Sequence, residues 1–125
     1  MVLRRWQPGS IVAGSLFHVD TDPAVAEFSR WYRGRHGSNP DHEATAALAD
    51  EWMSGVIPET RLSASPGRVH HQCSLIGDWI DDEIKHAAIA MLPDWVAWLA
   101  DRAGYAQPLR TRLADATATE LVRVI

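Results

Sequence analysis

Proline and glycine divide most of this 125-residue chain into segments of helical length. Asp22 and Pro23 open the first segment, because an acidic cap followed by proline in the first turn favours helix initiation. Gly34 or Gly37 ends it, since glycine readily takes the left-handed conformation that closes a helix. The apolar residues between these signals recur at the spacing of an amphipathic helix. They are Val25, Phe28, Trp31 and Tyr32.

Similar start signals, apolar stripes and breakers predict four further helices. The second begins with Ser38 or Asn39 as its cap and Pro40 in its first turn. Pro93 separates the third helix from the fourth, because proline lacks the N–H that a continuous helix requires. The four predicted helices cover about residues 40–55, 70–92, 93–104 and 108–124.

Two segments lack helical signals. Residues 1–20 are rich in β-branched and large apolar residues around a Pro-Gly turn, which predicts a β-hairpin that must pack on the helices or on a partner. Residues 56–69 hold two prolines and a Ser-Pro-Gly sequence, and they are expected to form an irregular loop. The predicted fold is therefore mainly α: a single domain over residues 1–125, a compact bundle of about five helices with a short N-terminal β-hairpin.

Composition limits the classes of function. The hydrophobic fraction is 46% and the formal net charge is −4, which indicates a globular chain and disfavours a general nucleic-acid binder. Nothing approaches the roughly 20 apolar residues of a membrane span. Cys73 is the only cysteine, so no disulfide forms within the chain, and a reducing cytoplasmic location is expected. Eleven of the twelve basic residues are arginine, a usage typical of a GC-rich bacterial genome.

Six tryptophans are the most unusual feature of the composition. Tryptophan buries a large area and its indole N–H needs an acceptor, so the residue is frequent both in cores and in interface hot spots. Trp95 and Trp98 lie three residues apart in a helix that is apolar over much of its circumference. Such a helix is either central to the core or covered by a partner. With Trp6, these two residues form the predicted interaction surface, which would bind another protein or a second copy in a homodimer.

A cluster of acidic and histidine residues suggests an alternative, a small-molecule or metal site that could make the protein an enzyme. On one continuous helix over residues 70–92, His71, Asp82 and His86 follow a polar stripe, and Cys73 and Glu83 face the apolar side. Glu83 and His86 have the Glu-x-x-His spacing of carboxylate-bridged metal sites in helical bundles. Such sites need two of these motifs, and the chain has one. A single zinc ion is the other cofactor considered, although the ligand spacing matches no common zinc pattern.

Arginines alternate with aromatic residues at the end of the first helix, where Arg30, Arg33 and Arg35 surround Trp31 and Tyr32. This arrangement is typical of phosphate contacts combined with base stacking, and it predicts nucleic-acid binding as a second alternative. Cations are also favoured at a helix C-terminus by the helix dipole, with no ligand involved.

Sequence motifs for catalysis are missing: there is no Gly-x-Ser-x-Gly, no glycine-rich phosphate loop and no His-Glu-x-x-His. The leading hypothesis is therefore a small non-enzymatic interaction or regulatory module. Its partner would be a protein rather than a membrane or a nucleic acid.

Overall fold

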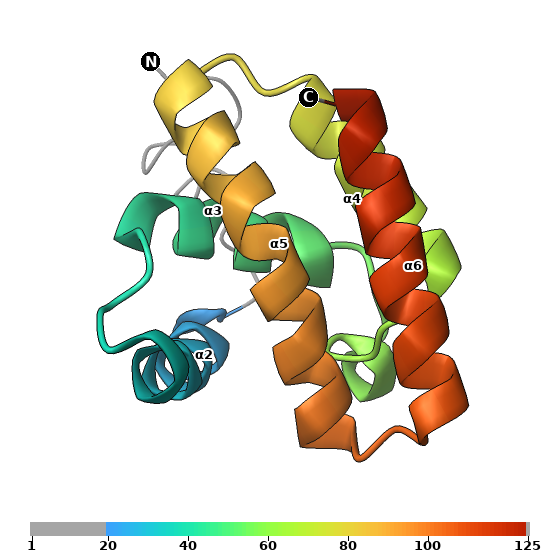
Figure 1. The fold of residues 1–125 in the computed structure, drawn as a ribbon. Coiled ribbons are helices and arrows are strands. Elements are labelled where there is room, and N and C mark those ends of the chain that lie inside the picture. Colours follow the sequence, from blue (N-terminus) through green and yellow to red (C-terminus); the bar gives the residue numbers. More distant parts are fainter. Residues whose placement is uncertain (1–19, 125) are drawn as a thin grey trace.

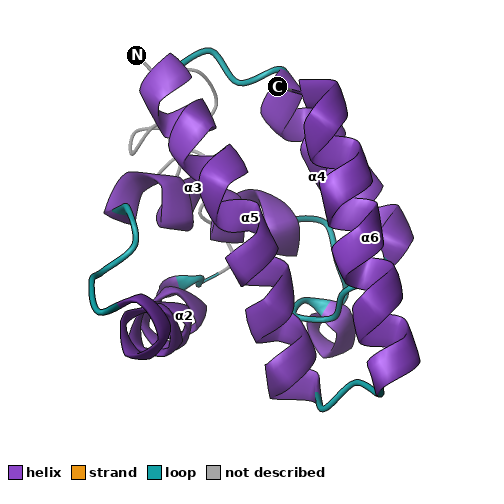
Figure 2. Ribbon diagram, in the orientation of Figure 1, coloured by secondary structure: helices purple, strands orange, loops and turns teal. Residues whose placement is uncertain are grey.

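The computed structural model describes residues 20–124, and these residues are helical over most of their length with no β-strand among them (Figure 2). The predicted hairpin and Trp6 lie outside the described residues. Five α-helices and one short 3-10 helix make up the described fold. They are α2 (Asp22–His36), α3 (His42–Met53), η2 (Pro58–Thr60), α4 (Pro66–Gly77), α5 (Asp82–Ala103) and α6 (Gln107–Val124).

The longest helix, α5, lies at the centre of the molecule. It contacts α2 and α3 on one side and α4 and α6 on the other (Figure 1). α4 and α6 run side by side and form the most extensive helix pair. α5 and α6 are joined by the short turn at residues 104–106 and diverge away from it (Figure 1). Because α5 and α6 diverge, the surfaces that they turn toward each other move apart with distance from the turn.

Side-chain caps fix where three of the helices start. Asp41 Oδ1 accepts from the Ala44 N–H at 2.8 Å, Ser65 Oγ from the Arg68 N–H at 3.1 Å, and Asp81 Oδ1 from the Ile84 N–H at 3.0 Å. Each cap satisfies one of the N–H groups that the first helical turn leaves without an intrahelical partner.

Glycines close α2 and α5. Gly37 and Gly104 have φ angles of 79° and 68°, in the left-handed region that non-glycine residues rarely adopt. Of the two predicted ends of the first helix, Gly34 and Gly37, the structure has Gly37, and the predicted end at Gly104 is confirmed.

The boundary between the predicted third and fourth helices is wrong. The chain breaks at residues 78–81, between α4 and α5, and continues through Pro93 as one 22-residue helix. Asp81 explains the position of the break, because its side chain caps a new helix and so competes with continuation of the old one. Pro93 is exposed, so its ring lies on the surface of α5, away from the crowded core.

The predicted loop over residues 56–69 is too long. Residues 58–60 form η2, and α4 begins at Pro66. The Ser-Pro-Gly sequence is a helix start rather than a turn: Ser65 is the cap and Pro66 occupies the first helical position, where its missing N–H costs nothing. The second helix also starts later than predicted, at His42, because Asp41 rather than Ser38 or Asn39 provides the cap.

An aromatic cluster forms the core between α2, α3 and α5. The Phe28 ring is fully buried, with its centroid 5.3 Å from that of Trp95 and 5.5 Å from that of Trp98, in edge-to-face arrangements. Trp52 of α3 packs against Trp95 with a centroid separation of 6.3 Å. The aromatic residues therefore hold three helices together.

Candidate functional site

The two tryptophans predicted to form an interaction surface lie in the interior of the chain. Trp95 is 0% exposed and Trp98 is 2% exposed. An apolar helix is either central to the core or covered by a partner, and α5 is central to the core. The Trp95 indole N–H has no hydrogen-bond acceptor among the described residues, and its ring packs against Phe28, Trp52 and Trp98.

Three other indoles connect elements of the fold. Trp31 donates to Asp101 Oδ2 at 3.0 Å, Trp52 to the Ser63 carbonyl at 3.3 Å, and Trp79 to Glu51 Oε1 at 3.0 Å. Each bond joins residues far apart in sequence. These tryptophans therefore stabilise the fold through their polar edges as well as their area.

The acidic and histidine residues of the predicted ligand site are divided between two helices. His71 and Cys73 belong to α4, whereas Asp82, Glu83 and His86 belong to the first turns of α5. The continuous polar stripe required one helix and is lost at the break between them. Within residues 20–124, no three His, Cys, Asp or Glu side chains are grouped closely enough to hold a metal ion.

Cys73 lies in the α4–α6 packing rather than near Glu83. Its side chain is buried, and burial raises the pKa of the thiol to about 11, with the negative charge of Glu120 adding to the effect. A thiol of this kind stays protonated near neutral pH and is a poor metal ligand or nucleophile.

The arginines of the predicted nucleic-acid patch are exposed near the end of α2. Arg35 already has partners, since its guanidinium lies 5.1 Å from the Trp31 ring centroid and its Nε lies 3.7 Å from Asp94. His36 Nε2 also contacts Asp94, at 3.1 Å. This end of α2 is thereby tied to α5, and of the three arginines in this patch Arg30 and Arg33 form no ion pair with a described residue.

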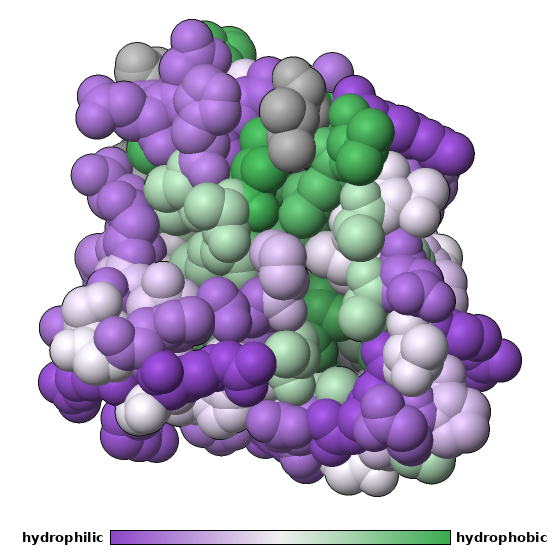
Figure 3. Space-filling model, viewed as in Figure 1, coloured by the Kyte–Doolittle hydropathy of each residue, from purple (hydrophilic) through white to green (hydrophobic). Residues whose placement is uncertain are grey.

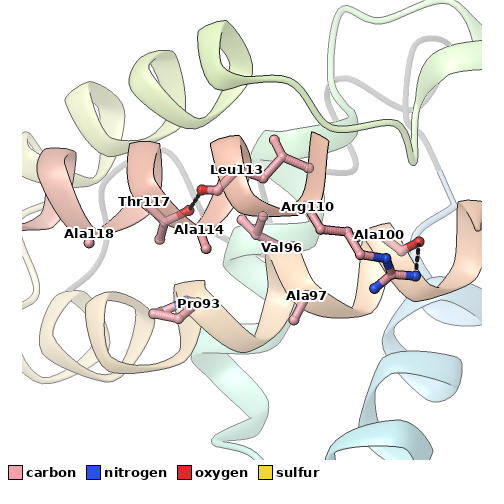
Figure 4. A pocket seen from close by; sticks show the side chains of 9 residues that line it. All are labelled: Pro93, Val96, Ala97, Ala100, Arg110, Leu113, Ala114, Thr117 and Ala118. Carbon is pink, nitrogen blue, oxygen red and sulfur yellow. Dashed lines mark hydrogen bonds between the residues drawn. The ribbon is translucent and has the colours of Figure 1, made fainter. Parts of the chain in front are cut away.

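Between α5 and α6 lies an apolar groove with a volume of about 210 Å³. Figure 4 shows Val96, Ala114 and Thr117 projecting into the space between the two ribbons. The Thr117 hydroxyl donates to the Leu113 carbonyl at 2.7 Å, so it presents its methyl group rather than a free donor. The groove is lined by Pro93, Val96, Ala97, Ala100, Arg110, Leu113, Ala114, Thr117 and Ala118.

Small side chains create this groove. Leu113 and Thr117 close the seam between the helices and are almost fully buried, whereas Ala114 and Ala118 on α6 and Pro93 on α5 remain exposed. Alanines leave the backbones accessible, so another element can approach at the short interaxial distances of packed helices. In Figure 3 apolar residues gather over this part of the surface, with polar residues around them.

Arg110 closes the groove at the α5–α6 turn. Its guanidinium donates to the Tyr105 carbonyl at 2.8 Å, to the Ala100 carbonyl at 3.1 Å and to Asp101 Oδ1 at 2.6 Å (Figure 4 shows the Ala100 bond). The hydrogen bond from Arg110 lowers the pKa of Asp101. The ends of the two helices are thus held together here.

A larger, polar cavity of about 610 Å³ lies between the end of α3 and the start of α4. His71 lines it together with Glu51, Arg68 and Gln72. Glu51 accepts from Gln72 Nε2 at 2.6 Å and from Trp79, and Arg68 donates to the carbonyls of Trp52, Thr60 and Ser63. Because these groups already hold α3, α4 and the connecting segment together, the cavity is better explained as a part of the scaffold.

The α5–α6 groove is not among the sites predicted from the sequence. The small residues at helical spacing in 114–118 are the signal that indicates it. No described helix is both long and apolar enough to cross a bilayer. Neither a protein-family profile, nor a characterised protein, nor a solved structure matches this chain.

Proposed function

We propose that this protein is a non-enzymatic interaction module that binds an amphipathic helix of a partner protein in the groove between α5 and α6. The observation that supports this most directly is the exposed small-residue surface of Pro93, Ala114 and Ala118 beside a buried apolar floor. Helices that bind in grooves do so through apolar residues at three- and four-residue spacing. The groove-lining residues of α5 and of α6 recur at this same spacing.

The charge of the protein surface indicates which kind of partner helix would bind. The chain has a net charge of −4, and Asp115 lies exposed on α6 next to Ala114. Asp94 and Asp101 are the acidic residues on the α5 side, each already contacted by a cation. A partner helix with lysine or arginine beside its apolar face would be attracted to this surface, whereas an acidic helix would be repelled.

A pair of designed peptides tests the proposal. Both are 18-residue amphipathic helices with the same leucine face, one with lysine and the other with glutamate on the polar face. The lysine peptide should bind in a saturable manner and shift backbone amide signals of residues 93–100 and 110–118 in two-dimensional NMR spectra. Equal binding of both peptides, or shifts spread over the whole molecule, would count against a specific groove.

Ala118→Glu supplies the matching variant, because it places a charge in the groove at an exposed position that the fold does not need. Binding of the lysine peptide should weaken by about tenfold or more, since an unpaired carboxylate would be buried against the leucine face. Ala26→Glu, at an exposed alanine of α2, is the control and should bind as the unchanged protein does.

A homodimer through the same groove is the second candidate, since two copies could cover each other's exposed alanines. Light scattering distinguishes the two. A dimer that Ala118→Glu converts to a monomer would replace the partner-helix proposal, and a monomer at all concentrations would remove the homodimer.

A further inference from the structure

A third cavity, of about 350 Å³, lies away from the α5–α6 groove, between the η2 segment and the end of α5. Its volume is within the range that holds small organic molecules. Its lining combines the apolar residues Met53, Pro58 and Leu62 with the polar residues Arg61, Arg102 and Tyr105. Such a combination suits a ligand with an apolar body and a charged end.

Arg61 is the most informative residue in this cavity. Its Nε is buried and has no hydrogen-bond acceptor among the described residues. A buried donor without an acceptor is destabilising, and native structures seldom leave one in that state. The Arg61 guanidinium therefore has hydrogen-bonding capacity that no described residue uses.

Neighbouring groups add donors and positive charge. The Arg102 Nε donates to Glu27 at 3.0 Å, and the other two guanidinium nitrogens have no acceptor among the described residues. The Tyr105 hydroxyl accepts from the Ala64 N–H at 3.1 Å, so its own proton is available for donation. Arg68 interacts electrostatically with Tyr105, and among the described residues no carboxylate pairs with it.

Glu59 is the one acidic residue lining the cavity. Glu27 pairs with Arg102, so Arg61, Arg68 and Arg102 against Glu27 and Glu59 leave a single net positive charge, which suits a monoanion better than a dianion. A carboxylate also matches the planar fork of a guanidinium, with two oxygens facing two N–H groups.

We infer that this cavity binds a small carboxylate, whose charged end meets Arg61, Arg102 and the Tyr105 hydroxyl and whose apolar body packs against Met53, Pro58 and Leu62. The inference depends on no part of the proposed helix-binding groove. Its residues are separate from those that line the groove.

Titration of the protein with benzoate, phenyl phosphate and benzyl alcohol tests the site. Benzoate should give saturable shifts of the amide signals of Arg61, Leu62 and Tyr105, phenyl phosphate weaker ones because of Glu59, and benzyl alcohol none. Tighter binding of phenyl phosphate would overturn the choice of a carboxylate. Comparable binding of benzyl alcohol, or no saturable binding of benzoate, would overturn the site altogether.

Variants distinguish specific binding of benzoate in this cavity from general electrostatic attraction of anions to the protein. Arg61→Gln and Arg102→Gln should each weaken benzoate binding by about tenfold or more, and Arg61→Lys should have a smaller effect because the charge remains. Arg112→Gln, at an exposed arginine of α6, should bind benzoate normally. Circular dichroism identifies any variant that has lost its fold. Unchanged binding in a folded Arg61→Gln or Arg102→Gln variant would overturn the assignment.

Discussion

Arg68 shows how single polar residues in this chain determine local structure. Its guanidinium donates to the Ser63 and Thr60 carbonyls at 2.6 and 2.7 Å and also to the Trp52 carbonyl, and it stacks 4.4 Å from the Trp52 ring centroid. Burial lowers the pKa of this group. Two carbonyls of the segment between α3 and α4 and one at the end of α3 obtain their donors from one side chain, which is how this largely irregular segment keeps a fixed path.

Cys73 provides a prediction at the same scale. Because burial raises the pKa of its thiol from 9.0 to about 11, the folded protein at pH 8 should contain about 100-fold less thiolate than the unfolded chain. Reaction with a disulfide reagent such as 5,5′-dithiobis(2-nitrobenzoate) should be slower in the folded state by at least this factor. Complete reaction of the native protein at the rate of the urea-unfolded chain would contradict the burial of Cys73.

The same thiol gives stability a pH dependence whose sign is fixed. Between pH 9 and 11 the unfolded chain loses the proton that the folded chain retains, so the free energy of unfolding should decrease as pH rises through this window. Cys73→Ala removes the group and should show less of this decrease in urea titrations. An equal decrease in both proteins would assign the effect to other residues.

At the scale of elements, α5 illustrates what the sequence could and could not predict. Gly37 and Gly104 were identified as helix ends, because a left-handed cap is a local property of glycine. The break between α4 and α5 was missed, since apolar residues keep a helical spacing across it and only the Asp81 cap marks the new start. Pro93 was overrated as a breaker. Packing of α5 against four helices outweighs the local cost of one proline.

The α5–α6 groove was invisible in the sequence for a related reason. Whether Ala114 and Ala118 are covered depends on the angle between α5 and α6, which no local signal gives. The tryptophans were chosen because they are large, yet size favours burial as strongly as it favours binding.

Replacement of Pro93 tests whether α5 is one helix. Within a continuous helix, Pro93→Ala restores a backbone N–H that can bond to the Ile89 carbonyl, and we expect a gain of roughly 1–3 kcal/mol in the free energy of unfolding by urea. Pro108→Ala is the control, because Pro108 is the second residue of α6 and its N–H would have no intrahelical partner. If α5 were instead two helices that meet at Pro93, both variants would behave alike.

The whole molecule depends on α5 because this helix packs on both of its sides within one continuous hydrophobic core. The aromatic cluster joins it to α2 and α3, and the buried residues Val69, Cys73 and Leu113 belong to the layer that it forms with α4 and α6. Because both sides pack on the same helix, a loss of packing on one side of α5 also weakens the packing on its other side. The predicted single domain should therefore unfold as one cooperative unit.

Phe28→Ala tests this cooperativity from the α2 side. Phe28 is fully buried against Trp95 and Trp98, so removal of its ring should cost about 3–5 kcal/mol. Many small domains have a total stability of only about 5–15 kcal/mol. Cys73, in the distant α4–α6 layer, should then react faster with the thiol reagent, and its midpoint of exposure in urea should coincide with that of tryptophan fluorescence. Protection of Cys73 that outlasts the fluorescence change would mean that the α4–α6 layer folds independently of the aromatic cluster. In that case the groove would lie on the boundary between two units, and helix binding should stabilise them jointly rather than one alone.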